Sequence, residues 1–357
     1  MEHALDAPDQ QGADLQDASP EYDSRPPTIP SAAAVAGGGQ SPAPQVGSEA
    51  LEGDVIAGRY RVDGILGEGG MGIVYRCHDL NENETVALKR VIVPESEFAE
   101  EYIMWFYKEA RALAAVDHPG IVGARDFGRL RDGSPYLVMD LAPGVSLHDL
   151  AHAGLKWPAI WHVVDQILGA LGHAHARGII HGDLKPSNVL VEEVSGEPPL
   201  VHMLDFGLAW LKRETHDERL DGEKAPEFKP HAGAGTPGYM APEQIQHEQH
   251  HVCGATDLYA LGCILYRLIG RGPPFGGTAK ELLRQHAFKE VPRLAPAIDV
   301  PDGVVDVVMR MLEKQPWHRW EFAAEARRRW AQFRPVNTTE ADFVLPRIRP
   351  AETRALP

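Results

Sequence analysis

The sequence has 357 residues, of which 43% are hydrophobic and 24% charged, enough material for one bilobal domain or two small domains with tails. Its formal net charge of −16 disfavours nonspecific binding to nucleic acid or to an anionic membrane, and we expect neither as a partner. No apolar run reaches the roughly 18 residues that span a bilayer, and the cysteines, Cys77, Cys253 and Cys263, are scattered without paired spacing. We therefore expect a soluble, cytoplasmic protein, whose oligomeric state the sequence leaves open.

Residues 1–53 differ in composition from the rest of the chain. They are rich in alanine, proline, glycine, serine and acidic residues and contain almost no large apolar side chains. Such a segment cannot bury enough apolar surface to offset the entropy of ordering it. We expect a disordered tail, which is either a solvated extension only or a carrier of phosphorylated serine and threonine.

A glycine-rich hairpin is predicted directly after the tail. Two runs of β-branched and aromatic residues, 60–66 and 73–75, flank the sequence Gly-Glu-Gly-Gly-Met-Gly at 67–72. Glycines there allow backbone N–H groups to approach a triphosphate closely. Gly-x-Gly-x-x-Gly also occurs in dinucleotide-binding folds, but those place a helix directly after it, whereas here a second strand follows.

Two charged residues lie in the apolar elements that come next. Lys89 lies in a predicted strand, 86–91, and Glu109 in a helix that apolar spacing predicts over 96–116. Taken alone, such a lysine is most often a solvated edge residue, and such a glutamate an exposed charge that pairs with a neighbouring base. Their interpretation depends on the rest of the chain.

The middle of the chain changes from strands to helices. A turn at Asp132-Gly133 precedes a buried strand at 136–141. Further along, a short hairpin is predicted from the runs 189–191 and 201–204. The helices that apolar spacing predicts are 146–150, 158–177, 256–270, 278–288, 302–313 and 321–332.

The most informative stretch is His-Gly-Asp-Leu-Lys-Pro-Ser-Asn at 181–188, followed by Asp-Phe-Gly at 205–207. Phosphoryl transfer needs a carboxylate to orient the attacking hydroxyl, a cation on the moving phosphate and oxygen ligands for a metal ion. Residues of these types stand in the order recorded for protein kinases: Asp183, Lys185, Asn188 and Asp205. On these residues the chain resembles the protein kinase family, in particular the bacterial Ser/Thr kinases of eukaryotic type.

The resemblance implies an α+β, bilobal protein kinase fold. Its N-lobe would be a small antiparallel β-sheet with one main helix, and its C-lobe a larger α-helical body. The implied boundaries are 54–141 for the N-lobe and 142–334 for the C-lobe. Residues 335–357, which carry proline and charge, would form a loose C-terminal extension.

The resemblance also implies ATP as nucleotide and Mg²⁺, or Mn²⁺, as metal. Asp183 would be the base, Lys89 and Lys185 would contact phosphates, and Glu109 would pair with Lys89. Asn188 and Asp205 would hold the metal ion. The residues implied to surround ATP are Gly67, Glu68, Gly69, Gly70, Met71, Gly72, Val74, Ala87, Lys89, Met139, Asp140, Ala142 and Leu190.

The segment Gly-Thr-Pro-Gly-Tyr-Met-Ala-Pro-Glu at 235–243 extends the resemblance. In kinases that act on serine and threonine, the threonine here, Thr236, bonds both the base and the lysine at 185. Glu243 is expected to pair with Arg319. Asp257 is expected to support the backbone of residues 181–188, the catalytic loop of the family.

One position departs from the family pattern. Gly182 stands where arginine is commonest, and that arginine often pairs with a phosphate on the activation loop. Between Leu208 and Gly235 the only hydroxyl is Thr215, far from the usual phosphate position. Both features predict a kinase that does not depend on activation-loop phosphorylation. We expect the charged segment 212–231 to be mobile.

A histidine cluster, His247, His250 and His251, invites a metal-site interpretation. It has no cysteine and no well-spaced carboxylate beside it, so a solvated loop is the simpler interpretation.

The sequence as a whole predicts an ATP-dependent kinase of protein serine and threonine. The alternative is a nucleotide-binding pseudokinase that acts as a scaffold, which the complete set of catalytic residues disfavours. A kinase of small molecules is a third interpretation, disfavoured by segment 235–243, which seats a peptide in protein kinases.

Overall fold

The computed structural model describes residues 50–69, 72–93, 99–206, 210–211, 236–246 and 248–348. For a few residues inside its helices and strands, Glu109 among them, only the backbone is described. The predictions for most of the tail, for the segment 212–231 and for His247 lie outside the described residues.

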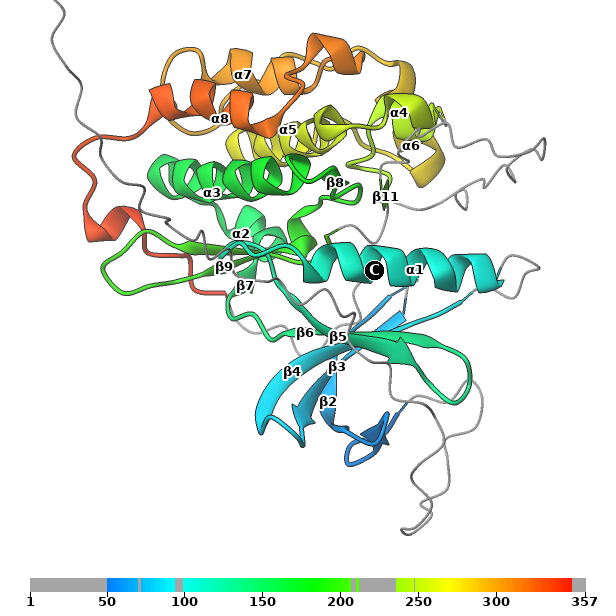
Figure 1. The fold of residues 1–357 in the computed structure, drawn as a ribbon. Helices are drawn as coiled ribbons and strands as arrows, with labels where there is room; N and C mark the ends of the chain where they lie inside the picture. Colours follow the sequence, from blue (N-terminus) through cyan, green and yellow to red (C-terminus); the bar gives the residue numbers. More distant parts are fainter. Residues whose placement is uncertain are drawn as a thin grey trace, which may run out of the picture. The chain divides into compact units, whose positions relative to one another are not determined.

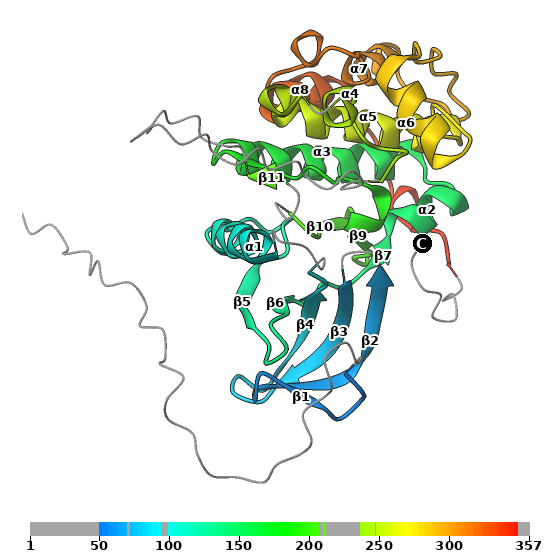
Figure 2. The same cartoon turned by 90° about the vertical axis from the view of Figure 1, so that its right-hand side faces the viewer.

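The first part of the described chain is an antiparallel sheet with the strand order β1-β2-β3-β4-β6-β5 (Figure 1). One helix, α1 (Ala99–Ala114), packs against β5 and β6, and Figure 2 shows it nearly end-on, next to β5. The β5–β6 hairpin turns at Gly133, whose φ of +89° suits glycine. The strands are β1 (Val55–Ile56), β2 (Tyr60–Gly69), β3 (Gly72–Asp79), β4 (Glu84–Val91), β5 (Ala124–Arg129) and β6 (Pro135–Asp140).

The two faces of this sheet carry different side chains, because alternate residues of a strand point to opposite sides. One face packs into its own apolar core, whose members include Tyr60, Tyr75, Val86, Leu88 and Val138. Ala87 and Lys89 point to the other face. The register sets Val74 beside Lys89 and Met139 beside Ala87, so these four side chains share that face.

The sheet core begins earlier than the composition predicts. Ala50 is buried in this core, and its N–H donates to the Tyr75 hydroxyl at 3.2 Å. The N–H of Gly53 donates to the carbonyl of Val62. Residues 50–53 therefore belong to the folded part and not to the tail.

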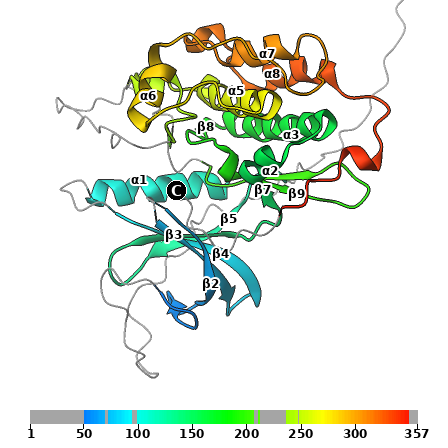
Figure 3. The ribbon, with the colours of Figure 1, turned by 180° about the vertical axis from the view of Figure 1, so that it is seen from behind.

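The second part of the described chain is dominated by helices built around α3 and α5. Both carry long runs of buried apolar side chains because each is covered on more than one side. α8 packs against α3 and α7 against α5 (Figures 1 and 3). The helices are α2 (Leu147–Ala153), α3 (Trp157–His175), α4 (Pro242–Ile245), α5 (Gly254–Gly270), α6 (Ala279–Phe288), α7 (Val304–Met311) and α8 (Ala323–Trp330).

Short strands carry the loops that matter for the site. β7 (Val145–Ser146), β9 (Val189–Glu192) and β10 (Leu200–Met203) form a sheet in the order β10-β9-β7. β8 (Ile179–Ile180) pairs with β11 (Trp210–Leu211). β9 and β10 form the predicted hairpin, and β10 leads directly into Asp205.

The predicted fold class is confirmed, and the predicted long helices are present with ends shifted by up to three residues. α4 was not predicted, because a four-residue helix leaves no periodic pattern. Within the described residues, no helix combines the length and apolar character needed to cross a membrane.

The expectation of a loose C-terminal extension is wrong for residues 335–348. Leu345 is only 5% exposed and belongs to the main core. The Phe343 ring lies 5.2 Å from that of His162, and Lys156 Nζ donates to the Ala341 carbonyl at 2.8 Å. Figures 1 and 3 show this segment running from α8 past β9 towards β7.

Candidate active site

An ion pair joins the sheet to the loop that follows β10. Lys89 Nζ lies 2.8 Å from Asp205 Oδ1. The lysine side chain is only 6% exposed, whereas that of Asp205 is 30% exposed. Burial alone would raise the pKa of Asp205, but Lys89, with His181 and Lys185 nearby, holds it below its ordinary value. The carboxylate is therefore charged at neutral pH.

The backbone of Asp205 is held in an uncommon conformation. Its φ is +55°, in the left-handed region that non-glycine residues seldom adopt and that costs about 1–3 kcal/mol. The next residue, Phe206, is buried, and its ring lies 4.7 Å from the ring of His181. Packing of Phe206 thus fixes the strained turn that presents the Asp205 carboxylate.

The carboxylate of Asp183 is held from two sides. Lys185 Nζ donates to its Oδ2 at 2.8 Å, and the backbone N–H of Thr236 donates to its Oδ1 at 3.1 Å. The Thr236 hydroxyl lies 3.5 Å from the same oxygen, at the limit of hydrogen-bonding distance. The predicted contact of Thr236 with Asp183 is present. No hydrogen bond between Thr236 and Lys185 is found in the described residues.

Asn188 ties the catalytic loop to the end of β10. Its Nδ2 donates to the Asp183 carbonyl at 3.0 Å, and its own carbonyl accepts from Leu204 N–H at 2.9 Å. The side chain is buried. Contacts therefore connect Asp183, Lys185, Asn188, Asp205 and Lys89, which are spread over more than one hundred residues of sequence.

Asp257 of α5 supports the backbone of the catalytic loop, as predicted. Its carboxylate accepts from the N–H groups of His181 and Gly182, each at 2.8 Å, and from His175 Nε2 at 2.9 Å. Desolvation would raise the pKa of Asp257, but these hydrogen bonds hold it below its ordinary value. The carboxylate is a charged, fully buried anchor for the loop.

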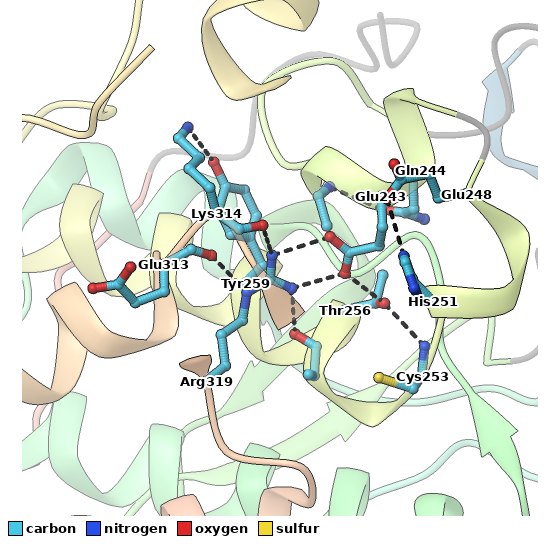
Figure 4. Close-up of polar contacts among 12 residues, drawn as sticks. Glu243, Gln244, Glu248, His251, Cys253, Thr256, Tyr259, Glu313, Lys314 and Arg319 are labelled. Carbon is cyan, nitrogen blue, oxygen red and sulfur yellow. Dashed lines mark hydrogen bonds and ion pairs between the residues drawn. The ribbon is translucent and has the colours of Figure 1, made fainter. Parts of the chain in front are cut away.

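Glu243 and Arg319 form the predicted ion pair, and both side chains are almost completely buried. Arg319 Nη1 and Nη2 donate to the two carboxylate oxygens at 2.7 and 3.0 Å (Figure 4). The Thr256 hydroxyl donates to Glu243 as well, at 2.8 Å. The remaining Arg319 donors bond the carbonyls of Ala255, Glu313 and Lys314. This pair fixes the end of segment 236–243 to the helical body.

The residues predicted to surround the adenine occupy one face of the sheet and the hairpin opposite it. Val74, Ala87 and Met139 share the face of Lys89, while Leu190 lies on β9. Asp140 ends β6, and its carboxylate pairs with Arg125. Ala142 lies beyond it and packs against the main core. Contacts with a nucleotide remain a prediction for all of them.

The glycine hairpin is described only in part. Gly67, Glu68 and Gly69 end β2 and Gly72 begins β3, whereas Gly70 and Met71 lie outside the described residues. The structure gives a reason for glycine at position 72 that the sequence did not indicate. A Cβ there would lie 1.9 Å from the Arg90 carbonyl oxygen on β4. Glycine is required at 72 for strand packing, whatever its role towards phosphate.

The donor set for a metal ion fits a hard cation. Asp205 Oδ2 and Asn188 Oδ1 accept no hydrogen bond within the described residues. Mg²⁺ takes oxygen ligands and is commonly held by one or two side chains together with phosphates and water. In the described part of the chain no cluster of three or more His, Cys, Asp or Glu offers an all-protein site. For Glu109, only its place on α1 is described.

Two residues of the site were missed in the sequence. His175, at the end of α3, bonds Asp257, and Gln244 of α4 donates through Nε2 to the Gly182 carbonyl at 2.7 Å. In the sequence, the position of Gln244 directly after Glu243 was the only indication of its role. No sequence pattern indicated the role of His175.

Comparisons with known proteins agree with this geometry. A family model described as protein kinase domain matches residues 60–331. Serine/threonine-protein kinase pkn3 of Myxococcus xanthus is 35% identical over 277 residues, covering 75% of this chain and 48% of that protein. DNA damage-responsive serine/threonine-protein kinase RqkA of Deinococcus radiodurans is 36% identical over 289 residues, covering 78% and 40%. The chain thus spans less than half the length of these curated relatives.

Solved structures give the same fold. The kinase domain of PknI from Mycobacterium tuberculosis, solved as a double mutant, superposes with a TM-score of 0.55. That match covers 80% of this chain and 99% of the other at 23% identity, which supports the fold alone.

Proposed function

Because the chain belongs to the protein kinase domain family, we propose that it transfers the γ-phosphate of ATP to serine and threonine hydroxyls of proteins. The main observation in support of the proposal is that hydrogen bonds and an ion pair connect the site residues. Asp183 is held by Lys185 and Thr236, and Asn188 bonds both Asp183 and Leu204, the residue that precedes Asp205 of the ion pair with Lys89. Phosphoryl transfer depends on positioning and electrostatics, which a connected set of this kind provides.

In this proposal Asp183 orients the substrate hydroxyl and accepts its proton. Lys185 neutralises charge on the transferred phosphate, and Lys89 contacts the α- and β-phosphates, with Glu109 as its partner on α1. Asn188 and Asp205 bind the divalent cation, which when bound spreads the negative charge of the phosphates. Their oxygen donors suit Mg²⁺, with Mn²⁺ as a substitute.

The adenine site is proposed between the sheet and β9. Val74 and Ala87 would cover the base from the sheet side, Leu190 from the other, with Met139 behind it. The carbonyl of Asp140 and the N–H of Ala142 would bond its edge. The backbone of residues 67–72 would approach the phosphates.

Selection of serine and threonine over tyrosine is supported by two features. Lys185 Nζ lies 2.8 Å from one carboxylate oxygen of Asp183, and the N–H of Thr236 donates to the other. The relatives from Myxococcus xanthus and Deinococcus radiodurans are named as serine/threonine kinases.

Independence from activation-loop phosphorylation is also proposed. Gly182 has no side chain that could bind a phosphate, and the loop is held by Asp257 and Gln244 instead. Replacing Thr215, the only hydroxyl between 208 and 235, by alanine is expected to leave turnover unchanged. A turnover that falls with loss of this hydroxyl contradicts the proposal.

We place the protein in the cytoplasm with ATP and proteins as its partners. Three cysteines without paired spacing and a net charge of −16 support that placement. Nucleic acid and membrane are not among the proposed partners.

The test is transfer of radiolabelled phosphate from ATP to protein by the wild type and by Asp183→Asn. Acid hydrolysis of the product is expected to yield phosphoserine and phosphothreonine. Asp183→Asn should bind nucleotide but lose transfer, because an amide cannot accept the proton. Nucleotide binding without any wild-type transfer would identify a pseudokinase scaffold instead.

A further inference from the structure

The carbonyl that precedes the catalytic base has an unusual partner. Gly182 has a φ of +73°, and its two backbone polar groups are bonded by side chains that come from different helices. The N–H donates to Asp257 of α5 at 2.8 Å. The carbonyl accepts from Gln244 Nε2 of α4 at 2.7 Å.

Gln244 is built into this position. Its side chain is buried, and its Oε1 accepts from the N–H of Ala241 at 2.9 Å. Both ends of the amide are therefore used, one on segment 236–243 and one on the catalytic loop. Neighbouring Glu243 is fixed by its buried pair with Arg319, so the backbone that carries Gln244 has a rigid support.

The carbonyl of Gly182 belongs to the peptide unit that leads into Asp183. The orientation of this peptide fixes φ at Asp183, one of the torsions that set the direction of its side chain towards Lys185 and Thr236. A glycine has no Cβ to restrict rotation of the peptide. The orientation of this peptide therefore depends on the hydrogen bonds that its polar groups make.

We propose that Gln244 is a positioning residue for the catalytic base, which it orients by holding the Gly182 carbonyl. The proposal rests on the proposed function. In this proposal the neutral side chain of Gln244 orders the catalytic loop, in place of the contact between an arginine and a phosphate. It also couples the segment that seats the substrate to the loop that carries the base, because Gln244 bonds both.

The test compares Gln244→Glu with the wild type over a range of pH. A carboxylate can still accept from Ala241, but it has no hydrogen to donate to the Gly182 carbonyl. When protonated it regains a donor, and burial raises the pKa of such a carboxyl. We expect kcat to fall about 10- to 100-fold at pH 8 and the ratio of variant to wild type to recover as the pH is lowered to 6. The KM for ATP should stay within about twofold.

Gln244→Met supplies a second variant that is neutral at every pH. It should lose a similar factor in kcat without recovering at low pH. Gln166→Met is the matched control, because Gln166 also donates to backbone carbonyls, those of Pro199 and His162, and accepts from one N–H, that of Val201. Its melting temperature should fall while its kcat per folded molecule stays at the wild-type value.

These experiments distinguish failure of the proposed function from failure of the inference about Gln244. An inactive wild type overturns the proposed function and this inference with it. An active wild type with unchanged kcat in Gln244→Met overturns the inference alone. So does a pH-independent ratio for Gln244→Glu, or a loss in Gln244→Met that merely follows the unfolded fraction, because a structural role predicts those results.

Discussion

Two ion pairs anchor the site, and they differ in how completely their atoms are used. In the Arg319–Glu243 pair, both side chains are at most 1% exposed, and Arg319 also bonds three carbonyls while Glu243 accepts from Thr256. In the Lys89–Asp205 pair, the carboxylate is 30% exposed and keeps an oxygen without a hydrogen bond in the described residues. We call the Arg319–Glu243 pair saturated, because its donors and acceptors are all used, and such a pair is suited to holding structure. We call the Lys89–Asp205 pair unsaturated, because it keeps an acceptor that is unused within the described residues, and such a pair is suited to binding a ligand.

The same contrast separates the two sides of the site. The catalytic loop is held by Asp257, Gln244 and Thr236 through hydrogen bonds to its backbone and to its base. The sheet reaches Asp205 through the Lys89 contact. The helical side therefore holds the loop through several hydrogen bonds, whereas the sheet meets Asp205 through a single ion pair in the described residues.

The largest expected effect follows from the unsaturated pair. In Asp205→Asn the proposed metal ligand loses its charge, and kcat/KM should fall at least about 10²- to 10³-fold. The melting temperature should change little, because this side chain is partly exposed and an asparagine oxygen can still accept from Lys89. Initial rates and thermal unfolding measure both quantities.

Asp306→Asn is the matched control for that variant, since Asp306 pairs with Arg293 on the surface. It should alter neither quantity. A large fall in stability for Asp205→Asn, with turnover reduced only in proportion, would show that the pair is structural.

The saturated pair should respond in the opposite way. Arg319→Met leaves the Glu243 charge buried without its partner, so the free energy of unfolding should fall by about 3–5 kcal/mol. Urea unfolding measures it. Arg293→Met, in the exposed pair, should cost less than about 1 kcal/mol, and equal losses for both variants would refute the distinction.

The surroundings of the saturated pair give a pH dependence. His286 is buried against Tyr259, whose ring lies under Arg319 at 4.8 Å. Burial, with Lys314 nearby, lowers the pKa of His286 to about 4. Between pH 4 and 6.5 the unfolded chain then binds more protons than the folded one, so stability should fall by about 1–3 kcal/mol as the pH drops through this window.

His286→Gln should remove that part of the pH dependence, as urea unfolding at pH 7, 5.5 and 4.5 would show. Parallel curves for wild type and variant would mean that His286 is not kept neutral by its surroundings. In that case water reaches the interior around Arg319 and His286.

The smallest effect concerns the catalytic loop itself. Gly182→Ala places a side chain at a φ of +73°, which should cost about 1 kcal/mol of stability. Gly178→Ala is the matched control, with the same φ and open space around its added methyl group. Only Gly182→Ala should also lower kcat, by a few-fold, and equal kcat values would contradict the importance of this peptide's orientation.

Much of the site could be predicted from the sequence because the chemistry fixes the order of residue types. Asp183, Lys185, Asn188 and Asp205 lie in short motifs, and the resemblance led from Glu243 to Arg319 across 76 residues. Helix positions followed from apolar spacing. Gly72 was predicted for phosphate approach, whereas the structure requires it for packing against β4.

The rest depends on contacts that leave no pattern. Gln244 and Gly182 are 62 residues apart, and His175 and Asp257 are 82 apart, with nothing in the sequence to pair them. The C-terminal segment has the polar, proline-containing composition of a loose tail, yet Leu345 anchors it in the core. One buried side chain is too little to change a compositional prediction.

The most direct test of a catalytic loop held by the protein's own side chains is the first turnover of phosphate-free enzyme. The protein would be treated with phosphatase, shown by intact mass to carry no phosphate, and mixed with ATP, Mg²⁺ and a protein substrate. The account predicts transfer at the full rate from the start. A lag that ends as Thr215 becomes phosphorylated, or no transfer at all, would contradict it.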